Sequence, residues 1–423
     1  MLLLLLGLCV NCLCANTQAP SDEVFEAIRK GDAQKVQSLL SQGLDVNCRG
    51  EKRMTPLITA AKYDRFDIAL LLCEKGADVN ATSFAHAADE DGCMSPLLWA
   101  SSNGNIKMAQ LFLQRGASIN ETSTYEFTPL LAAAQKGHLA IVEFLVDNGA
   151  NIDYSGPITE DSALKTAVSN GDVDVVRFLV SKGANIHVPY RYGGTLLLSG
   201  RFGSLEMIKF LVGCGLDINS QTDFGDTIFT LLAGNSFQVE RLSVWKYLIR
   251  NRGNILLKDS HGRSPLMEAA RAGNPEIAKF LLKNGALINE ADNEGRTPLH
   301  LVNSSGDQQR NIGLVKLLLK NGAKVKANDS EGRTPLMFAC AAGNAEVTKI
   351  LLDHGAEINV QDKNGWTALM EAAKKGDLKC VKLLAGRGAD LNIKSNAGNN
   401  AIYMASYYKR TEVYDYLKSL ITK

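Results

Sequence analysis

Apolar and polar positions follow one another along this chain in pairs of short segments, and each segment has the period of a helix. In "GRSPLMEAARAGNPEIAKFLLKNGALIN" an alanine-rich apolar run precedes a polar break, and the stripe Ile277, Phe280, Leu281 and Leu282 follows it. Apolar residues three and four positions apart lie on one face of a helix. The pattern therefore predicts two short amphipathic helices, and a glycine ends each of them.

This pair of helices recurs along the chain. The segments "GRTPLMFACAAGNAEVTKILLDHGAEIN" and "GWTALMEAAKKGDLKCVKLLAGRGADLN" have the same pattern as the first. With the Thr or Ser of the T-P-L motif as origin, units begin near Asp22, Thr55, Ser95, Thr128, Ser162, Gly194, Thr227, Ser264, Thr297, Thr334, Thr367 and Asn400. A unit of this size cannot bury its apolar face alone, so neighbouring units are expected to stack.

The residues at the helix ends support this interpretation. A Thr or Ser hydroxyl at the origin caps a first helix, and the proline that follows it suits the first helical position because it has no N–H to leave unpaired. Second helices are expected to begin after Asn274, Asn344, Asp172 or Asp377. They are expected to stop at Gly43, Gly76, Gly116, Gly149, Gly183, Gly215, Gly253, Gly285, Gly322, Gly355 and Gly388.

A period of 33 residues with the pattern T-P-L-x-x-A resembles the ankyrin repeat, over roughly residues 21–420. The resemblance implies an all-α solenoid of about twelve helix-turn-helix units in a single array, with β-turn or hairpin fingers between units. The units that begin at Asp22 and Asn400 lack T-P-L and are expected to be polar caps. The resemblance also implies recognition of another protein by the finger tips and the concave first-helix face, without turnover or cofactor.

The sequence offers no catalytic constellation. None of the six histidines lies in an H-E-x-x-H motif, and neither a G-x-S-x-G elbow nor a G-x-x-x-x-G-K-[ST] loop is found. Glu268 and Glu371 occupy matching positions, but about three repeats separate them. His300 completes T-P-L-H, where the expected role is a hydrogen bond between repeats. We predict no catalytic, cofactor or metal residues, and a divergent solenoid enzyme is the less favoured alternative.

The net charge of the whole chain does not favour any particular class of partner. The 46 basic and 45 acidic residues leave a net charge of +1. Such a balance creates no field that favours nucleic acid or an anionic membrane surface. We therefore expect a protein partner and no small-molecule substrate, with membrane contact only through a possible lipid anchor, and a monomeric chain.

The N-terminus carries a separate signal. Leu2 to Val10 is an apolar run of the length of a signal-peptide core, too short to span a bilayer as a helix. We expect a signal peptide over residues 1–15, with cleavage near residues 12–16; a frayed apolar terminus is the alternative. "LGLC" and "CVNC" resemble lipoprotein signals, which would place a lipid on Cys9 or Cys12. The expected location is periplasmic, envelope-anchored or secreted, and cytoplasmic if the segment is not a signal.

The remaining cysteines predict packing rather than chemistry. Cys73, Cys340 and Cys380 fall where other units have Leu or Ala, so buried thiols are expected. Cys48 and Cys93 lie in the first two fingers. They would pair in an oxidising compartment only if the long second finger folds back, because disulfide geometry is demanding.

The finger tips differ between the two halves of the chain, and this difference suggests a binding surface. Later fingers keep a plain D-x-x-G turn, as at Asp292 and Gly295. Earlier tips hold large side chains instead, namely Tyr125, Phe127, Tyr154, Tyr190, Arg191, Tyr192 and Phe224. Lys136, Arg201 and Phe202 would extend this surface onto the concave face. The alternative is that the rings pack on adjacent fingers.

Two functions follow from these patterns. The first is an exported, non-catalytic scaffold that binds one protein partner with its finger tips and concave face. The second is a structural or protective protein of the cell envelope that has no single tight partner.

Overall fold

A computed structural model describes residues 22–83, 94–123, 126–156, 161–187, 194, 199, 204–234, 242–302 and 308–421. Across these residues the chain forms paired α-helices and a short 3-10 helix, Glu51–Arg53, with no β-strand. Its contacts divide it into two compact units, Met1–Ile186 and His187–Lys423. The paired helices confirm the predicted all-α fold class, whereas a single array over residues 21–420 stays a prediction.

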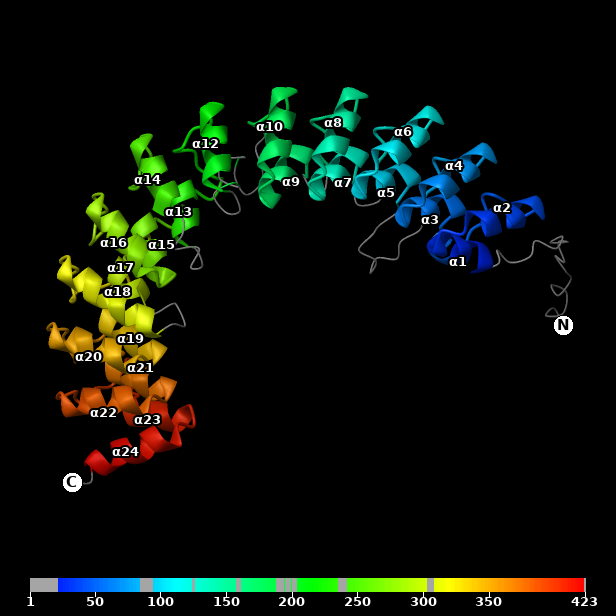
Figure 1. Cartoon of the computed structure of the whole chain (residues 1–423). Coiled ribbons are helices and arrows are strands. Elements are labelled where there is room, and N and C mark those ends of the chain that lie inside the picture. Colours follow the sequence, from blue (N-terminus) through cyan, green and yellow to red (C-terminus); the bar gives the residue numbers. More distant parts are fainter. Residues whose placement is uncertain are drawn as a thin grey trace, which may run out of the picture. The chain divides into compact units, whose positions relative to one another are not determined.

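Unit 1 stacks its helix pairs side by side. Its first helices lie in one row and its second helices in another, as Figure 1 shows. The first helices are α1 (Asp22–Lys30), α3 (Pro56–Lys62), α5 (Pro96–Ser102), α7 (Pro129–Gln135) and α9 (Ala163–Asn170). The second helices are α2 (Ala33–Ser41), α4 (Phe66–Glu74), α6 (Ile106–Gln114), α8 (Leu139–Asp147) and α10 (Val173–Ser181).

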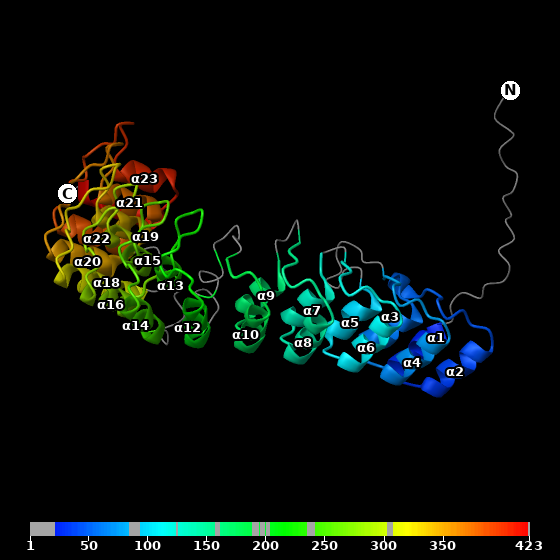
Figure 2. The ribbon, with the colours of Figure 1, turned by 90° about the horizontal axis from the view of Figure 1, so that it is seen from above.

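Unit 2 repeats the same two-row arrangement, and in each unit the loops that link successive pairs extend to one side of the helices (Figure 2). Its first helices are α13 (Ile228–Ala233), α15 (Pro265–Arg271), α17 (Pro298–Leu301), α19 (Pro335–Ala342), α21 (Ala368–Lys375) and α23 (Ala401–Tyr407). Its second helices are α12 (Leu205–Gly213), α14 (Leu242–Arg250), α16 (Pro275–Lys283), α18 (Gln308–Lys320), α20 (Ala345–Asp353), α22 (Leu378–Gly386) and α24 (Thr411–Ile421).

The predicted capping residues begin the helices. The hydroxyl of Thr55 accepts a hydrogen bond from the backbone N–H of Ile58 at 3.2 Å, and Pro56 takes the first helical position. Ser95, Thr128, Ser162, Ser264, Thr334 and Thr367 cap their helices in the same way. Asn274, Asn344 and Asp377 accept from the backbone at the starts of second helices, whereas Asp172 holds the capping position of α10 without a bond from its side chain. Each bond satisfies an N–H that has no partner within the helix.

The predicted stop glycines end the second helices in the left-handed conformation, with one correction. Ten of them have φ between 82° and 94°. The prediction for Gly253 is wrong, because Arg252 takes that position with φ of 66°. Gly253 is one residue further along, where a Cβ atom would come within 2.5 Å of the Phe229 ring. A close approach to an aromatic ring, rather than a left-handed turn, explains this glycine.

Apolar residues of each pair meet those of the neighbouring pairs to form the core. Ile277 and Leu281 of α16 are buried, and the ring of Phe280 lies 6.3 Å from that of Trp245 in α14. Cys73, Cys340 and Cys380 are buried free thiols, as predicted. Cys93 lies outside the described residues, so its pairing with Cys48 stays a prediction.

Candidate functional site

The later fingers of unit 2 are turns held by an aspartate side chain. In the finger of Asp292, the carboxylate accepts hydrogen bonds from the backbone N–H groups of Glu294 at 2.9 Å and Arg296 at 2.8 Å. Asp259, Asp329 and Asp362 make the same two bonds in their own fingers. The glycine of each D-x-x-G turn has φ between 74° and 79°. This geometry is what an Asx turn requires.

Neighbouring fingers are joined through their backbones. The N–H of Asn293 donates to the carbonyl of His261 at 2.9 Å, and that of Ser330 donates to the carbonyl of Glu294 at 2.8 Å. The same bond continues to Lys363 and Asn396. The later fingers therefore form a continuous hydrogen-bonded scaffold within unit 2.

The predicted aromatic surface lies partly outside the described residues. That is the case for Tyr125, Tyr190, Arg191, Tyr192, Arg201 and Phe202. In unit 1, Phe127 packs against the buried cluster of Met94, Leu98 and Ala132, Tyr154 is half-buried, and Lys136 is exposed at the end of α7. In unit 2, Phe224 is 51% exposed. Packing thus accounts for Phe127, and the surface as a whole stays a prediction.

The finger that holds Phe127 also contains a half-buried glutamate, Glu121. The hydroxyl of Ser95 donates a hydrogen bond to the carboxylate of Glu121. Burial raises the pKa of Glu121 to about 7, and the bond from Ser95 offsets only part of that rise. The finger therefore contains a carboxyl group that titrates near neutral pH.

Sequence reasoning missed an exposed tyrosine cluster at the end of unit 2. Tyr403, Tyr407 and Tyr408 are 46%, 66% and 37% exposed on and just after α23. The rings of Tyr403 and Tyr407 stack with centroids 5.9 Å apart, and that of Tyr408 meets Tyr407 edge-on at 5.1 Å. Stacked rings hold each other in place while their outer faces stay open to a partner. We call these three residues the tyrosine surface.

The tyrosine surface continues onto the first helix of the preceding pair. Lys374 of α21 places its Nζ atom 5.0 Å from the ring centroid of Trp366 and 5.7 Å from that of Tyr408. Trp366, Lys374 and Glu371 line a cleft there. Burial raises the pKa of Glu371 above its ordinary value. The surface thus combines aromatic faces with a cation held between two rings.

The segment "YMASYY" contains the signal that would have found this surface. It places tyrosines at i, i+4 and i+5 of a helix, so that two of them share a face. The unit at Asn400 lacks T-P-L and is predicted to be a polar cap, and its first helix also exposes these aromatic rings.

Glu268 is the most heavily paired carboxylate of the described first helices, and its contacts are structural. It is buried, with Arg263 Nη1 at 3.0 Å and Arg271 Nη2 at 2.7 Å. A carboxylate neutralised by two guanidinium groups is a poor general base. Glu371 belongs to a different repeat, as predicted.

His300 makes the predicted hydrogen bond between repeats. Its Nε2 donates to the carbonyl of Arg333 at 3.1 Å, and its Nδ1 accepts from the backbone N–H of Thr297 at 3.0 Å. Burial lowers the pKa of His300. A buried neutral imidazole with both nitrogens paired has a structural role. Within the described ranges, no group of three or more His, Cys, Asp or Glu side chains comes together as a metal site would require.

Paired helices and Asx-turn fingers that recur along the chain define a helical repeat protein. The chain belongs to the ankyrin repeat family: the family model described as "Ankyrin repeats (3 copies)" matches residues 5–83, 24–123, 97–190, 196–292, 285–362 and 356–422. One relative, alpha-latrocrustotoxin-Lt1a of Latrodectus tredecimguttatus, is 39% identical over 79 residues. That match covers 17% of this chain and 6% of the toxin.

None of the described helices has the length and the apolar character needed to cross a bilayer.

Proposed function

We propose that this ankyrin repeat protein is a non-catalytic scaffold that holds a protein partner on first-helix and finger-tip surfaces. The family typically mediates binding between proteins, and the tyrosine surface is the observation that supports such a role most directly. Tyrosine is enriched among residues that dominate binding energy, because it buries a large rigid ring and keeps a hydroxyl for hydrogen bonding.

The partner surface that fits has an apolar or aromatic centre and at least one carboxylate. The rings of Tyr403 and Tyr407 would pack against the apolar centre of the partner. Lys374, already desolvated on one side by Trp366, would take the carboxylate. The predicted finger surface around Tyr125 and Tyr190 would add contacts of the same kind.

Affinity capture from the protein's own cells tests this proposal. The double variant Tyr403→Ala/Tyr407→Ala should lose the proteins that the wild type retains, with at least about 2 kcal/mol of binding free energy removed. The matched control is Tyr63→Ala in unit 1, since Tyr63 is 40% exposed and stacks on no ring of a described residue. If both variants retain the same proteins as the wild type, the tyrosine surface is not the interface.

We also propose that the protein is exported, which rests on the apolar run from Leu2 to Val10 alone. Mass spectrometry of the protein from its own cells should find a mature N-terminus between residues 9 and 16. An intact Met1 would contradict export, and a lipid-modified Cys9 or Cys12 would show an envelope anchor. The second candidate, a protective envelope protein, would give the same N-terminus without reproducible partner capture.

A further inference from the structure

The near-neutral charge of the whole chain conceals a division between its two units. Unit 1 contains 15 basic and 22 acidic residues, a net charge of −7. Unit 2 contains 31 basic and 23 acidic residues, a net charge of +8. Unit 2 therefore attracts anions, although the chain as a whole does not.

The cations of unit 2 gather where three consecutive second helices end. The turns after α14, α16 and α18 span residues 250–256, 283–289 and 320–326, and they contain no Asp or Glu. Their exposed cations are Arg250, Arg252, Lys283, Lys320, Lys324 and Lys326. Lys326 pairs with Glu357 at 2.7 Å, whereas the other five make no ion pair with any described residue. Five cations are thus left facing solvent.

This composition departs from the chain's own repeat pattern. Two residues after the left-handed position, five of the eight other units carry an acid, namely Asp45, Asp78, Asp217, Glu357 and Asp390, and the other three carry Ser118, Asn151 and Asn185. In the three turns the same position holds Asn254, Leu287 and Lys324. Cations in the last turn of a helix also stabilise its dipole, which would account for Arg250, Lys283 and Lys320. It does not account for Lys324 or for a leucine.

Two leucines replace a polar bridge in the middle of this region. Between most other turns a side chain, usually that of an asparagine, joins one turn to the next: Asn219 Oδ1 accepts from the N–H of Asn254 at 2.7 Å, and Asn289 Oδ1 accepts from that of Lys324 at 2.8 Å. Leu256 stands in the asparagine position, and Leu287 occupies the turn that the asparagine would reach. They are 42% and 52% exposed. The turns that contain Leu256 and Leu287 therefore lack the side-chain hydrogen bond between neighbouring turns and expose apolar surface instead.

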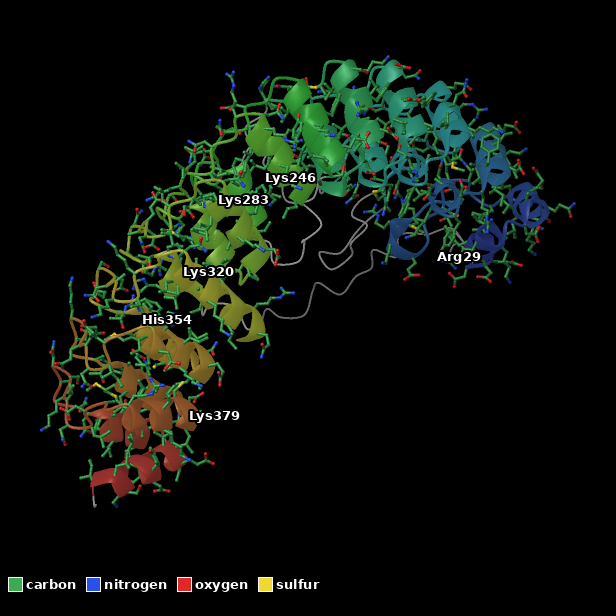
Figure 3. The ribbon with its side chains drawn as sticks, turned by 60° about the vertical axis from the view of Figure 1, so that its left-hand side comes forward. Arg29, Lys246, Lys283, Lys320, His354 and Lys379 are labelled. Atoms are coloured by element: carbon green, nitrogen blue, oxygen red, sulfur yellow. The ribbon has the colours of Figure 1, made fainter. Side chains whose placement is uncertain are left out.

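Packing holds the three turns next to one another within unit 2. The rings of Trp245 and Phe280 connect α14 to α16, and α16 contacts α18 directly. Figure 3 shows Lys246, Lys283 and Lys320 following one another along these helices, so the same row of helices presents further basic side chains. We call Arg250, Arg252, Lys283, Lys320 and Lys324, together with Leu256 and Leu287, the basic edge.

We propose that the basic edge docks on the surface of a membrane that contains anionic lipids. Lysine and arginine near such a surface each gain about 1 kcal/mol from the negative potential. The leucine pair would enter the boundary between headgroups and acyl chains, where exposed apolar side chains contribute most. A nucleic acid would pair with the cations but would leave both leucines in water, so lipid fits the whole set better. The contact needs no spanning helix and no lipid anchor.

Cosedimentation of the full chain with vesicles tests this proposal. Vesicles of phosphatidylcholine that contain phosphatidylserine should bind the protein at least about tenfold more tightly than vesicles of phosphatidylcholine alone. The variant Lys283→Gln/Lys320→Gln/Lys324→Gln should lower affinity for the anionic vesicles by at least about tenfold. Leu287→Ser should weaken binding at a salt concentration that already screens the lysines.

The matched control removes the same charge from neighbouring helices. Lys349→Gln/Lys379→Gln/Lys382→Gln changes three exposed lysines of α20 and α22 and should bind anionic vesicles as the wild type does. Circular dichroism should show every variant folded. Equal binding to both kinds of vesicle, no binding, or equal loss in the two lysine variants would overturn the proposal. So would an unchanged Leu287→Ser variant together with tight binding of duplex DNA at the same edge.

Discussion

At the scale of single residues, the turn that ends each second helix shows how one position fixes a residue type. Ten of the stop glycines have φ near 90°, where a side chain is strained. In the eleventh of these turns, Arg252 takes the left-handed position with φ of 66°. Spacing alone did not predict that Arg252 takes the left-handed position, because Gly253 is adjacent to it. Only the packing of Gly253 against Phe229 distinguishes the two positions.

Arg252 and Gly285 should respond to substitution in opposite directions. Arg252→Gly should raise the free energy of unfolding by about 1 kcal/mol, because it removes left-handed strain. Gly285→Ala should lower it by a similar amount, because its φ is 94° and nothing lies within 4 Å of an added Cβ to clash. Urea denaturation measures both. Two changes of the same sign would show that backbone strain does not decide this position.

His300 should make the protein less stable in mild acid. The pKa of a histidine in the unfolded chain is about 6.5, and burial lowers that of His300 in the folded state. As pH falls below about 6.5, the unfolded chain takes up the proton first, so stability is lost. Thermal melts of wild type and His300→Gln between neutral and mildly acidic pH should converge. A constant difference would mean that His300 does not carry the effect.

At the scale of elements, the helix pairs were predictable because cap, proline, apolar stripe and glycine agree in nearly every unit. Thr55, Ser264 and Thr334 were identified from the sequence and cap their helices as expected. The tyrosine surface was not predicted, because the T-P-L motif specifies only how a helix begins. It carries no information about which face of the helix is exposed, such as the face that Tyr403 and Tyr407 share.

A proline at Leu281 should damage one region of the protein more than the rest. Leu281 is fully buried inside α16, and proline there removes a helical hydrogen bond and clashes with the preceding turn. Leu281→Pro should cost about 3 kcal/mol or more. Hydrogen exchange should quicken in α14 to α18 and stay slow in α21 and α22, since each repeat contacts only its neighbours. Uniform acceleration along the chain would contradict this local coupling.

The predicted finger surface can be tested against the later fingers. Replacing Tyr125, Tyr190 and Tyr192 with Ala should weaken partner capture by at least about 2 kcal/mol with little change in melting temperature. Substitutions at Glu294, Glu331 and Asn364 should change neither. Their backbone carbonyls join the finger scaffold, and the ion pairs of Glu294 with Arg296 and of Glu331 with Lys363 involve exposed carboxylates, which contribute little. A large loss of stability in the tyrosine variant would show that its rings pack, as Phe127 does.

At the scale of the whole molecule, membership of the ankyrin family was predictable from the repeat, and the division of charge was not. A net charge of +1 averages an acidic unit with a basic one. The boundary at Ile186 that separates them became visible only in the contacts of the folded chain. Ankyrin repeats typically mediate binding between proteins, and the exposed side chains within each unit are where we propose that binding occurs.

Hydrogen exchange of the protein with and without a captured partner tests the central claim most directly. If the tyrosine surface is the interface, the partner should slow exchange in α23 and in α21 beneath it, and Tyr403→Ala/Tyr407→Ala should abolish that protection. Protection confined to the second helices α20, α22 and α24, with α21 and α23 unchanged, would contradict the claim.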